Sequence, residues 1–375
     1  SIRVAMLVLG ELLQDVDFSF STLRGIYGRL NEIYEFAVNF QSTYANVINS
    51  NLGNTLPASF VDSSPPATHN KAKDIASTAA HQYNTAFSLA KDLNLEDKWL
   101  LHKINATVIE VSKSFDEMRI RDALNTVLYL MDKDFEWYRK RRSSKNESEV
   151  NQENYAFVVY MFLKTRIKMM APISPFLGEE IWNLVFSKQD SIQSIFNSGW
   201  PEYEKGFVNI VTEENELLIS NLLEDLNKIL KVTKNINIHK IYIYLAGTKK
   251  KDLYAKMIDI VINTKTKNFG VIMKSLLSDL SISEEQKKFI KSNPELVKKI
   301  NEDILSLSPA ELDRRGQTKE FDEKIPLEDA KSLIASELKI HSDCIEIFDE
   351  NELGIADPKN KSRLSRPYKP AIYVE

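Results

Sequence analysis

Two prolines three residues apart shape residues 165–182, TRIKMMAPISPFLGEEIW. The apolar helix that reaches this stretch cannot continue through Pro172, because proline lacks the backbone amide and its ring clashes with the preceding turn. Ser174 then occupies the N-cap position of a new helix, and Pro175 occupies its first helical position. The stretch therefore predicts a long helix, a sharp break and a second, short helix that ends near Phe186. Locally it is a packing corner that carries no chemistry.

The chain before Trp182 has the apolar spacing of amphipathic helices and no convincing strand-like alternation. The expected helices lie at about residues 17–47, 67–93, 95–111, 114–142 and 155–171. The polar segment 49–66 is expected to be a long loop. The first half is thus predicted to be an all-α bundle of long helices.

The second half mixes strand and helix patterns. Asn235–Gly247 is β-branched and aromatic and ends at a glycine, and residues 343–348 and 371–374 also have strand patterns. A weaker strand pattern covers Phe321–Ile325. Helices are expected at about residues 212–231, 249–262, 268–279, 283–291, 294–305, 308–314 and 327–338. The predicted fold class is mainly α, with a helical bundle followed by a small α+β domain.

The length, composition and charge of the chain limit the class of protein to which it can belong. The chain has 375 residues, 43% of them hydrophobic and 27% charged, as in ordinary soluble globular proteins of two or three domains. No apolar run approaches the ~18 residues of a membrane span. The net charge is −4, yet Lys228–Lys274 holds eleven lysines against two aspartates. This asymmetry favours either a local electrostatic contact or a solvated lysine-rich surface.

A search for catalytic motifs is negative. The sequence has neither a G-x-G-x-x-G nor a G-x-x-x-x-G-K-[ST] motif, and its five histidines show no metal-ligand spacing. The single cysteine, Cys344, excludes a disulfide framework within the chain. We therefore expect no catalytic residue, no metal site and no cofactor site here.

The positive signals point to RNA. Trp137 and Tyr138 are followed by four basic residues, which combine cations with aromatic faces at a helix end. Cations at that end also suit the helix dipole, and the two interpretations have similar weight. The lysine-rich segment and a basic tail that runs from Lys359 to Lys369 are further, individually weak signals.

Taken in order, these pieces resemble a known family. The corner is similar to the M-x-P-x-x-P-x-x-x-E-E-x-W pattern of class I aminoacyl-tRNA synthetases. The leucyl-tRNA synthetases of the archaeal and eukaryotic type have counterparts of further segments in the same order. These are Asp15–Ser19, Tyr34–Ala37, Leu95–Asn105, Phe115–Ala123, Trp137–Arg141, Trp200–Glu202 and, most specifically, Lys369–Glu375.

The resemblance implies a C-terminal portion of a longer enzyme. The family's ATP-site histidine motif, its lysine–serine loop and its editing and zinc insertions are absent, and residues 1–15 resemble the end of the region that follows the catalytic core. The domains expected after it are a helical bundle of the anticodon-binding type at 16–206, a linker helix at 207–234 and a tRNA-binding α+β domain at 235–375. Residues 48–92 are expected to be an insertion in the bundle.

By resemblance, the parent enzyme attaches leucine to tRNA(Leu) with ATP and magnesium, and this portion holds the tRNA. The family reads the long variable arm through its C-terminal domain, and a monomeric, cytoplasmic protein is implied. The candidate tRNA-binding residues are Arg139, Lys140, Arg141, Arg142, Asp225, Lys228, Lys231, Lys249, Lys250, Lys251, Ala371, Ile372, Tyr373, Val374 and Glu375. The alternatives are the same portion of an isoleucine, valine or methionine enzyme, or a catalytically inactive tRNA-binding or scaffold paralogue.

Overall fold

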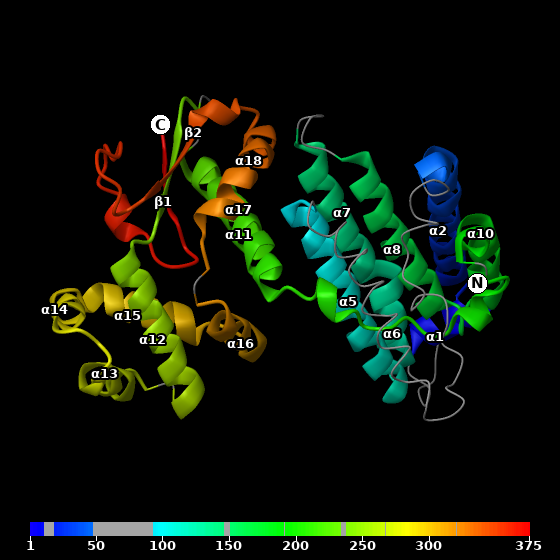
Figure 1. Ribbon diagram of the computed structural model, residues 1–375, viewed down its shortest axis with the longest axis horizontal. Coiled ribbons are helices and arrows are strands. Elements are labelled where there is room, and N and C mark those ends of the chain that lie inside the picture. Colours follow the sequence, from blue (N-terminus) through cyan, green and yellow to red (C-terminus); the bar gives the residue numbers. More distant parts are fainter. Residues whose placement is uncertain are drawn as a thin grey trace, which may run out of the picture. The chain divides into compact units, whose positions relative to one another are not determined.

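The computed structural model describes residues 1–10, 19–47, 93–145, 151–190, 192–233, 238–266, 268–319 and 321–375. The chain separates into two compact units, Ser1–Asn209 and Ile210–Glu375 (Figure 1). The first is a helical bundle, and the second combines helices with a three-stranded sheet. The predicted fold class is confirmed. No helix of the described residues is long and apolar enough to cross a membrane.

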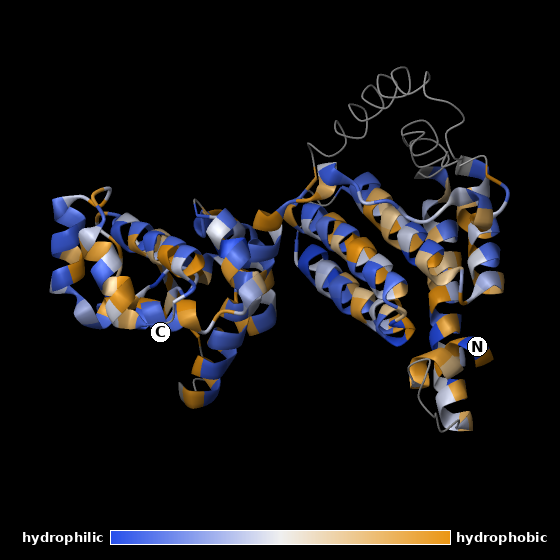
Figure 2. Ribbon diagram, turned by 90° about the horizontal axis from the view of Figure 1, so that it is seen from below, coloured by the Kyte–Doolittle hydropathy of each residue, from blue (hydrophilic) through white to orange (hydrophobic). Residues whose placement is uncertain are grey.

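The first unit is built around one buried helix. Its helices are α1 (Ile2–Leu9), α2 (Phe20–Val47), α5 (Leu95–Asp116), α6 (Ile120–Asn125), α7 (Met131–Ser143), α8 (Gln152–Met170), α9 (Pro175–Ile181) and α10 (Ser187–Asp190). Every residue from Ala156 to Met170 is buried, so α8 is the central helix. Most bundle helices carry both apolar and polar residues, as expected of amphipathic helices (Figure 2).

The proline corner forms as predicted, with one difference at its end. α8 ends at Met170, and Pro175 is the first residue of α9, but the Ser174 side chain makes no capping hydrogen bond. Glu179 instead accepts hydrogen bonds from the Ser194 hydroxyl at 3.1 Å and from the Ile195 amide at 3.0 Å. The second helix does not stop near Phe186. A π-helical turn, Trp182–Phe186, carries it into α10.

The second unit has a sheet in the order β2-β1-β3. β1 is parallel to β2 and antiparallel to β3, and the whole of β1 is buried. Its elements are α11 (Ile210–Thr233), β1 (Ile241–Leu245), α12 (Thr248–Thr264), α13 (Phe269–Ser278), α14 (Glu284–Ser292), α15 (Pro294–Leu305), α16 (Pro309–Gln317), α17 (Lys324–Asp329), α18 (Lys331–Leu338), β2 (Ile345–Asp349) and β3 (Ala371–Val374). α11, expected as a linker helix, belongs to this unit and packs against α16 and α17.

One expected strand is wrong. Residues 321–325 do not pair with the sheet, and α17 begins at Lys324. The Asp322 carboxylate accepts a hydrogen bond from the Lys324 amide at 2.9 Å, which favours the start of a helix. Pro326 lies in the first turn, where a missing amide costs no helical hydrogen bond. The acidic segment at 15–18 and the expected insertion at 48–92 lie outside the described residues.

Candidate nucleic-acid interface

The four basic residues at the end of α7 have different surroundings. Arg139 is exposed, and it forms no ion pair within the described parts of the chain. Lys140 is half-buried and lies over the Trp137 ring, 5.8 Å from its centroid. Arg141 and Arg142 are buried inside the bundle. The prediction of phosphate contacts is therefore narrowed to Arg139 and Lys140.

Arg142 has a structural role. Its guanidinium forms an ion pair with Asp97 of α5 at 3.0 Å, and it donates a hydrogen bond to the Asn151 carbonyl at 2.9 Å. The Tyr138 hydroxyl donates to the same Asp97 carboxylate at 2.7 Å. Burial raises the pKa of Asp97, while the Tyr138 hydrogen bond and the charge of Arg142 oppose that rise. Arg142 thus ties α5, α7 and the start of α8 together.

A hollow of about 580 Å³ opens beside this end of α7; we call it the α7 hollow. It brings together cations and aromatic rings from α2, α7, α8 and the turn that follows α7. Its lining residues are Tyr44, Arg139, Arg142, Ser143, Lys145, Gln152 and Tyr155. Cations beside exposed aromatic faces are the groups with which proteins bind single-stranded nucleic acid.

The α11 residues lie on an exposed face of the second unit. The Lys228 ammonium is 3.1 Å from the Asp225 carboxylate and 3.9 Å from that of Glu224. All three side chains are more than half exposed, so these contacts leave Lys228 available to a partner. Lys231, one turn further on, is exposed. The face therefore presents two lysines beside two acids.

Lys249, Lys250 and Lys251 form contacts with different acidic residues. Lys249 is exposed and pairs with Glu285 at 2.7 Å, and Lys251 lies 3.5 Å from Asp349. Lys250 is only 4% exposed, pairs with Glu350 at 2.8 Å and donates to the Arg363 and Ser365 carbonyls. Lys250 therefore fixes the turn at 363–365. Of the three, Lys249 is the most accessible to a phosphate.

The C-terminal tail forms an edge of the sheet. β3 pairs with β1, and the Glu375 carbonyl accepts hydrogen bonds from the amides of His239 and Lys240 at 2.7 and 3.1 Å. The Tyr373 ring stacks on Tyr242, with 5.9 Å between centroids. Among the strands that the structure describes, β3 has a neighbour on one side only, so its outer backbone groups face away from the sheet. These are the tail groups that could meet a nucleotide.

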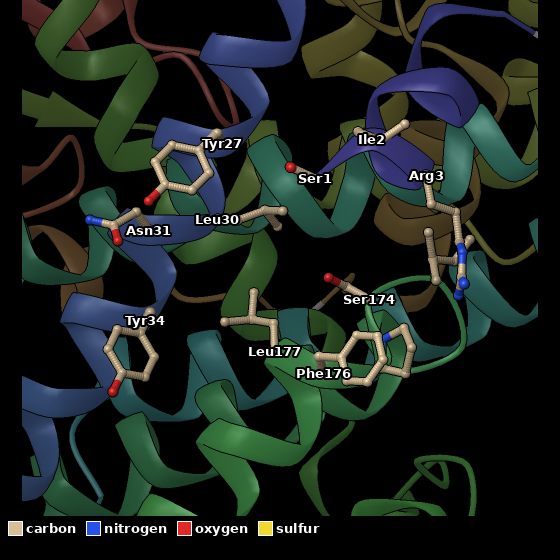
Figure 3. A pocket seen from close by; sticks show the side chains of 12 residues that line it. Ser1, Ile2, Arg3, Tyr27, Leu30, Asn31, Tyr34, Ser174, Phe176 and Leu177 are labelled. Atoms are coloured by element: carbon tan, nitrogen blue, oxygen red, sulfur yellow. The ribbon is translucent and has the colours of Figure 1, made fainter.

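A second opening, with a mainly apolar lining, lies at the proline corner. Figure 3 shows Tyr27, Leu30 and Tyr34 of α2 with Leu177 and Phe176 of α9 around a hollow of about 490 Å³, which we call the apolar groove. Within the described residues, no group of three or more histidine, cysteine or acidic side chains is placed to hold a metal ion. The groove is lined by residues suited to packing.

Comparisons with known proteins find relatives among the tRNA ligases. Residues 97–243 match the family model described as the anticodon-binding domain of tRNA ligase. The leucine–tRNA ligase of Methanococcoides burtonii is 28% identical over 311 residues, which cover 80% of this chain and 30% of that protein. The leucine–tRNA ligase of Methanococcus maripaludis strain C7 is 31% identical over 288 residues, 77% of this chain and 25% of that protein. The leucine–tRNA ligase of Pyrococcus furiosus is 26% identical over 279 residues, which cover 74% of this chain and 25% of that protein.

Over most of its length the chain is similar to part of the archaeal leucine–tRNA ligases. The predicted resemblance to the archaeal-type enzymes is thereby confirmed. The chain spans 25–30% of the length of these relatives. Within it, the anticodon-binding match covers the α7 end and the α11 face, whereas Lys249–Lys251 and β3 follow that match.

Tyr44 and Tyr155 are the aromatic residues of the α7 hollow that sequence reasoning missed. Both occupy ordinary positions on apolar helix faces, and Tyr44 is far from the α7 basic cluster in sequence. No local pattern distinguishes them from core tyrosines. Their one signal is spatial, since α2, α7 and α8 bring them to the same hollow as Arg139.

Proposed function

We propose that this chain is the tRNA-binding C-terminal portion of a leucine–tRNA ligase, which attaches leucine to tRNA(Leu) with ATP. The observation that carries the proposal is similarity to archaeal leucine–tRNA ligases over 74–80% of the chain, with the anticodon-binding match inside it. The reported relatives are all leucine enzymes, which favours leucine over isoleucine, valine and methionine. Catalysis, with ATP and magnesium, is assigned to the part of the relatives that this chain does not span.

We assign tRNA contacts to the residues that reach the surface. Arg139 and Lys140 would contact phosphates from the bundle, and Lys228, Lys231 and Lys249 would do so from the second unit. The outer edge of β3 would meet exposed nucleotides of the long variable arm. Contacts of this kind recognise the shape of an RNA as well as its charge. We further propose that this portion binds tRNA as a monomer.

Binding of labelled tRNA(Leu), followed by fluorescence anisotropy, tests the proposal. We expect the full chain to bind tRNA(Leu) more tightly than a tRNA(Leu) without its variable arm. Affinity should fall steeply between about 50 and 200 mM salt, because bound cations displace counterions from the RNA. An unchanged affinity after deletion of the arm would contradict variable-arm recognition. No binding at about 50 mM salt would contradict the tRNA-binding function as a whole.

A further inference from the structure

Three tyrosines form a ladder that leads from the bundle core to the α7 hollow. Tyr138 is fully buried and stacks on Tyr155, with 6.1 Å between centroids and planes 5° apart. Tyr155 in turn contacts Tyr44, with 5.5 Å between centroids. Tyr44 and Tyr155 are half-buried, so part of each ring faces the hollow. The core thus positions two aromatic rings at a surface opening.

The cations of the α7 hollow divide into two groups. Arg142 is fixed by Asp97 and lies over Tyr155, 5.1 Å from its centroid, and Lys145 pairs with Glu96 at 2.8 Å. Each inner cation thus has an acidic neighbour. Arg139 is different, because it is exposed and forms no ion pair within the residues that the structure describes. It is the cation best placed to receive an anion.

The phenol groups add no negative charge to the hollow. Burial raises the pKa of Tyr44 and Tyr155, and the nearby arginines oppose this rise only in part. Both rings are therefore neutral near pH 7 and present apolar faces. Gln152, which also lines the hollow, accepts a 3.4 Å hydrogen bond from the Tyr44 hydroxyl through its side-chain oxygen. A glutamine amide group also carries two N–H donors of the kind that can bind the edge of a base.

We propose that the α7 hollow binds one unstacked nucleotide of the tRNA, with its base against the solvent-facing parts of the Tyr44 and Tyr155 rings and a phosphate on Arg139. The proposal rests on the tRNA-binding function above and adds a site to it. A volume of about 580 Å³ lies within the range of ligand pockets, ~300–1,000 Å³. Core packing accounts for Tyr138, Arg142 and Lys145, but it leaves Arg139 and the solvent-facing parts of the Tyr44 and Tyr155 rings at the opening. A flat base with an adjacent negative charge matches both.

Substitutions in the full chain separate stacking from charge. Tyr44→Ala should weaken tRNA(Leu) binding about 5- to 100-fold, because stacking of one base is lost, and should leave the salt dependence unchanged. Tyr44→Phe keeps the ring and should stay within about twofold of the wild type. Arg139→Ala should weaken binding and lower the slope of log Kd against log salt by about 1. Thermal melts by circular dichroism check that each variant is folded.

Lys133→Ala is the matched control. Lys133 lies on the same helix, is exposed and forms no ion pair with the described residues. It does not line the hollow. Lys133→Ala removes the same charge as Arg139→Ala, but from a position outside the hollow. It should therefore change the affinity for tRNA(Leu) less than twofold. If Lys133→Ala weakens binding as much as Arg139→Ala does, the effect is general electrostatics and the proposal is wrong.

Two further measurements decide the identity of the ligand. Chemical probing of the tRNA 2′-hydroxyls should reveal one or two neighbouring nucleotides whose reactivity differs between complexes with wild type and with Tyr44→Ala. Free AMP should compete with tRNA only at millimolar concentration. AMP binding tighter than that of tRNA would overturn the proposal in favour of a free-nucleotide site. If the wild type binds tRNA but Tyr44→Ala and Arg139→Ala bind within twofold of it, the hollow is not used and the proposed function still stands.

Discussion

At the scale of single residues, neighbouring side chains of one type serve different purposes. Lys249 and Lys250 are adjacent on the first turn of α12, yet one is exposed and the other is buried. The same division separates Arg139 from Arg142 on α7. A run of basic residues on a helix turns through all directions, so only some of its members reach the surface. A partner therefore meets fewer charges than the sequence suggests.

Lys250→Met should destabilise the second unit by about 2–4 kcal/mol, because Glu350 and two backbone carbonyls lose their partner inside the protein. Lys249→Met removes an exposed ion pair and should cost less than about 0.5 kcal/mol. Urea unfolding of both variants measures the difference. Equal losses of stability would show that burial of Lys250 does not make its contacts stronger than those of Lys249.

Glu323 makes the second unit sensitive to pH. Burial raises its pKa to about 7, and its carboxylate accepts a hydrogen bond from the Tyr368 amide at 2.8 Å. Between about pH 4.5 and 7 the folded state therefore binds a proton that the unfolded state has released. This group's contribution to stability is greatest below about pH 4.5 and is lost as pH rises to 7, by up to about 3 kcal/mol.

Glu323→Gln removes this titration and keeps an oxygen that can accept the Tyr368 hydrogen bond. The variant should gain stability over the wild type as pH rises from 5 to 8, by about 2 kcal/mol. Urea unfolding at the two pH values gives the comparison. A difference between variant and wild type that is the same at both values would mean that Glu323 does not titrate in this range.

At the scale of elements, the proline corner depends on a close approach between α8 and α9. A Cβ on Gly178 would lie 3.3 Å from the Ala171 Cβ and 3.5 Å from Ile195, which is tight. Gly178→Val should therefore destabilise the bundle by about 1–3 kcal/mol. Gly25 in α2 has open space around its Cβ position, so Gly25→Ala should stabilise by about 0.5–1 kcal/mol through helix propensity. Thermal melts of the pair test this, and a neutral Gly178→Val would contradict the close packing.

Helices and the sheet could be predicted from the sequence because their signals are local. Periodic apolar residues and the Pro172–Pro175 spacing give the bundle helices, and β-branched runs give β1 and β3. The strand expected at 321–325 was wrong: α17 begins at Lys324, whose amide donates a hydrogen bond to the Asp322 carboxylate. The α7 hollow could not be predicted, because Tyr44 and Arg139 meet only when α2 packs beside α7. Burial of Arg141 and Arg142 likewise depends on which way α7 faces.

At the scale of the whole molecule, a chain of net charge −4 is proposed to bind a polyanion. Long-range attraction is then weak, and affinity must come from local contacts that match the RNA in shape. Lys228 and Lys249, which keep acidic neighbours, illustrate the point. We therefore expect duplex DNA at equal concentration to compete poorly with tRNA(Leu). Competition as strong as that of unlabelled tRNA(Leu) would indicate charge-driven binding without specificity.

The apolar groove has a practical consequence for anyone who handles this chain alone. Phe176 is 88% exposed, and Ile2 and Tyr27 beside it are about 60% exposed. Patches of this kind promote self-association in water. We expect light scattering to show oligomers that increase with protein concentration and dissolve in mild detergent. Phe176→Ser should raise the solubility limit and leave the affinity for tRNA unchanged. Oligomers that persist in this variant would show that another surface is responsible for self-association.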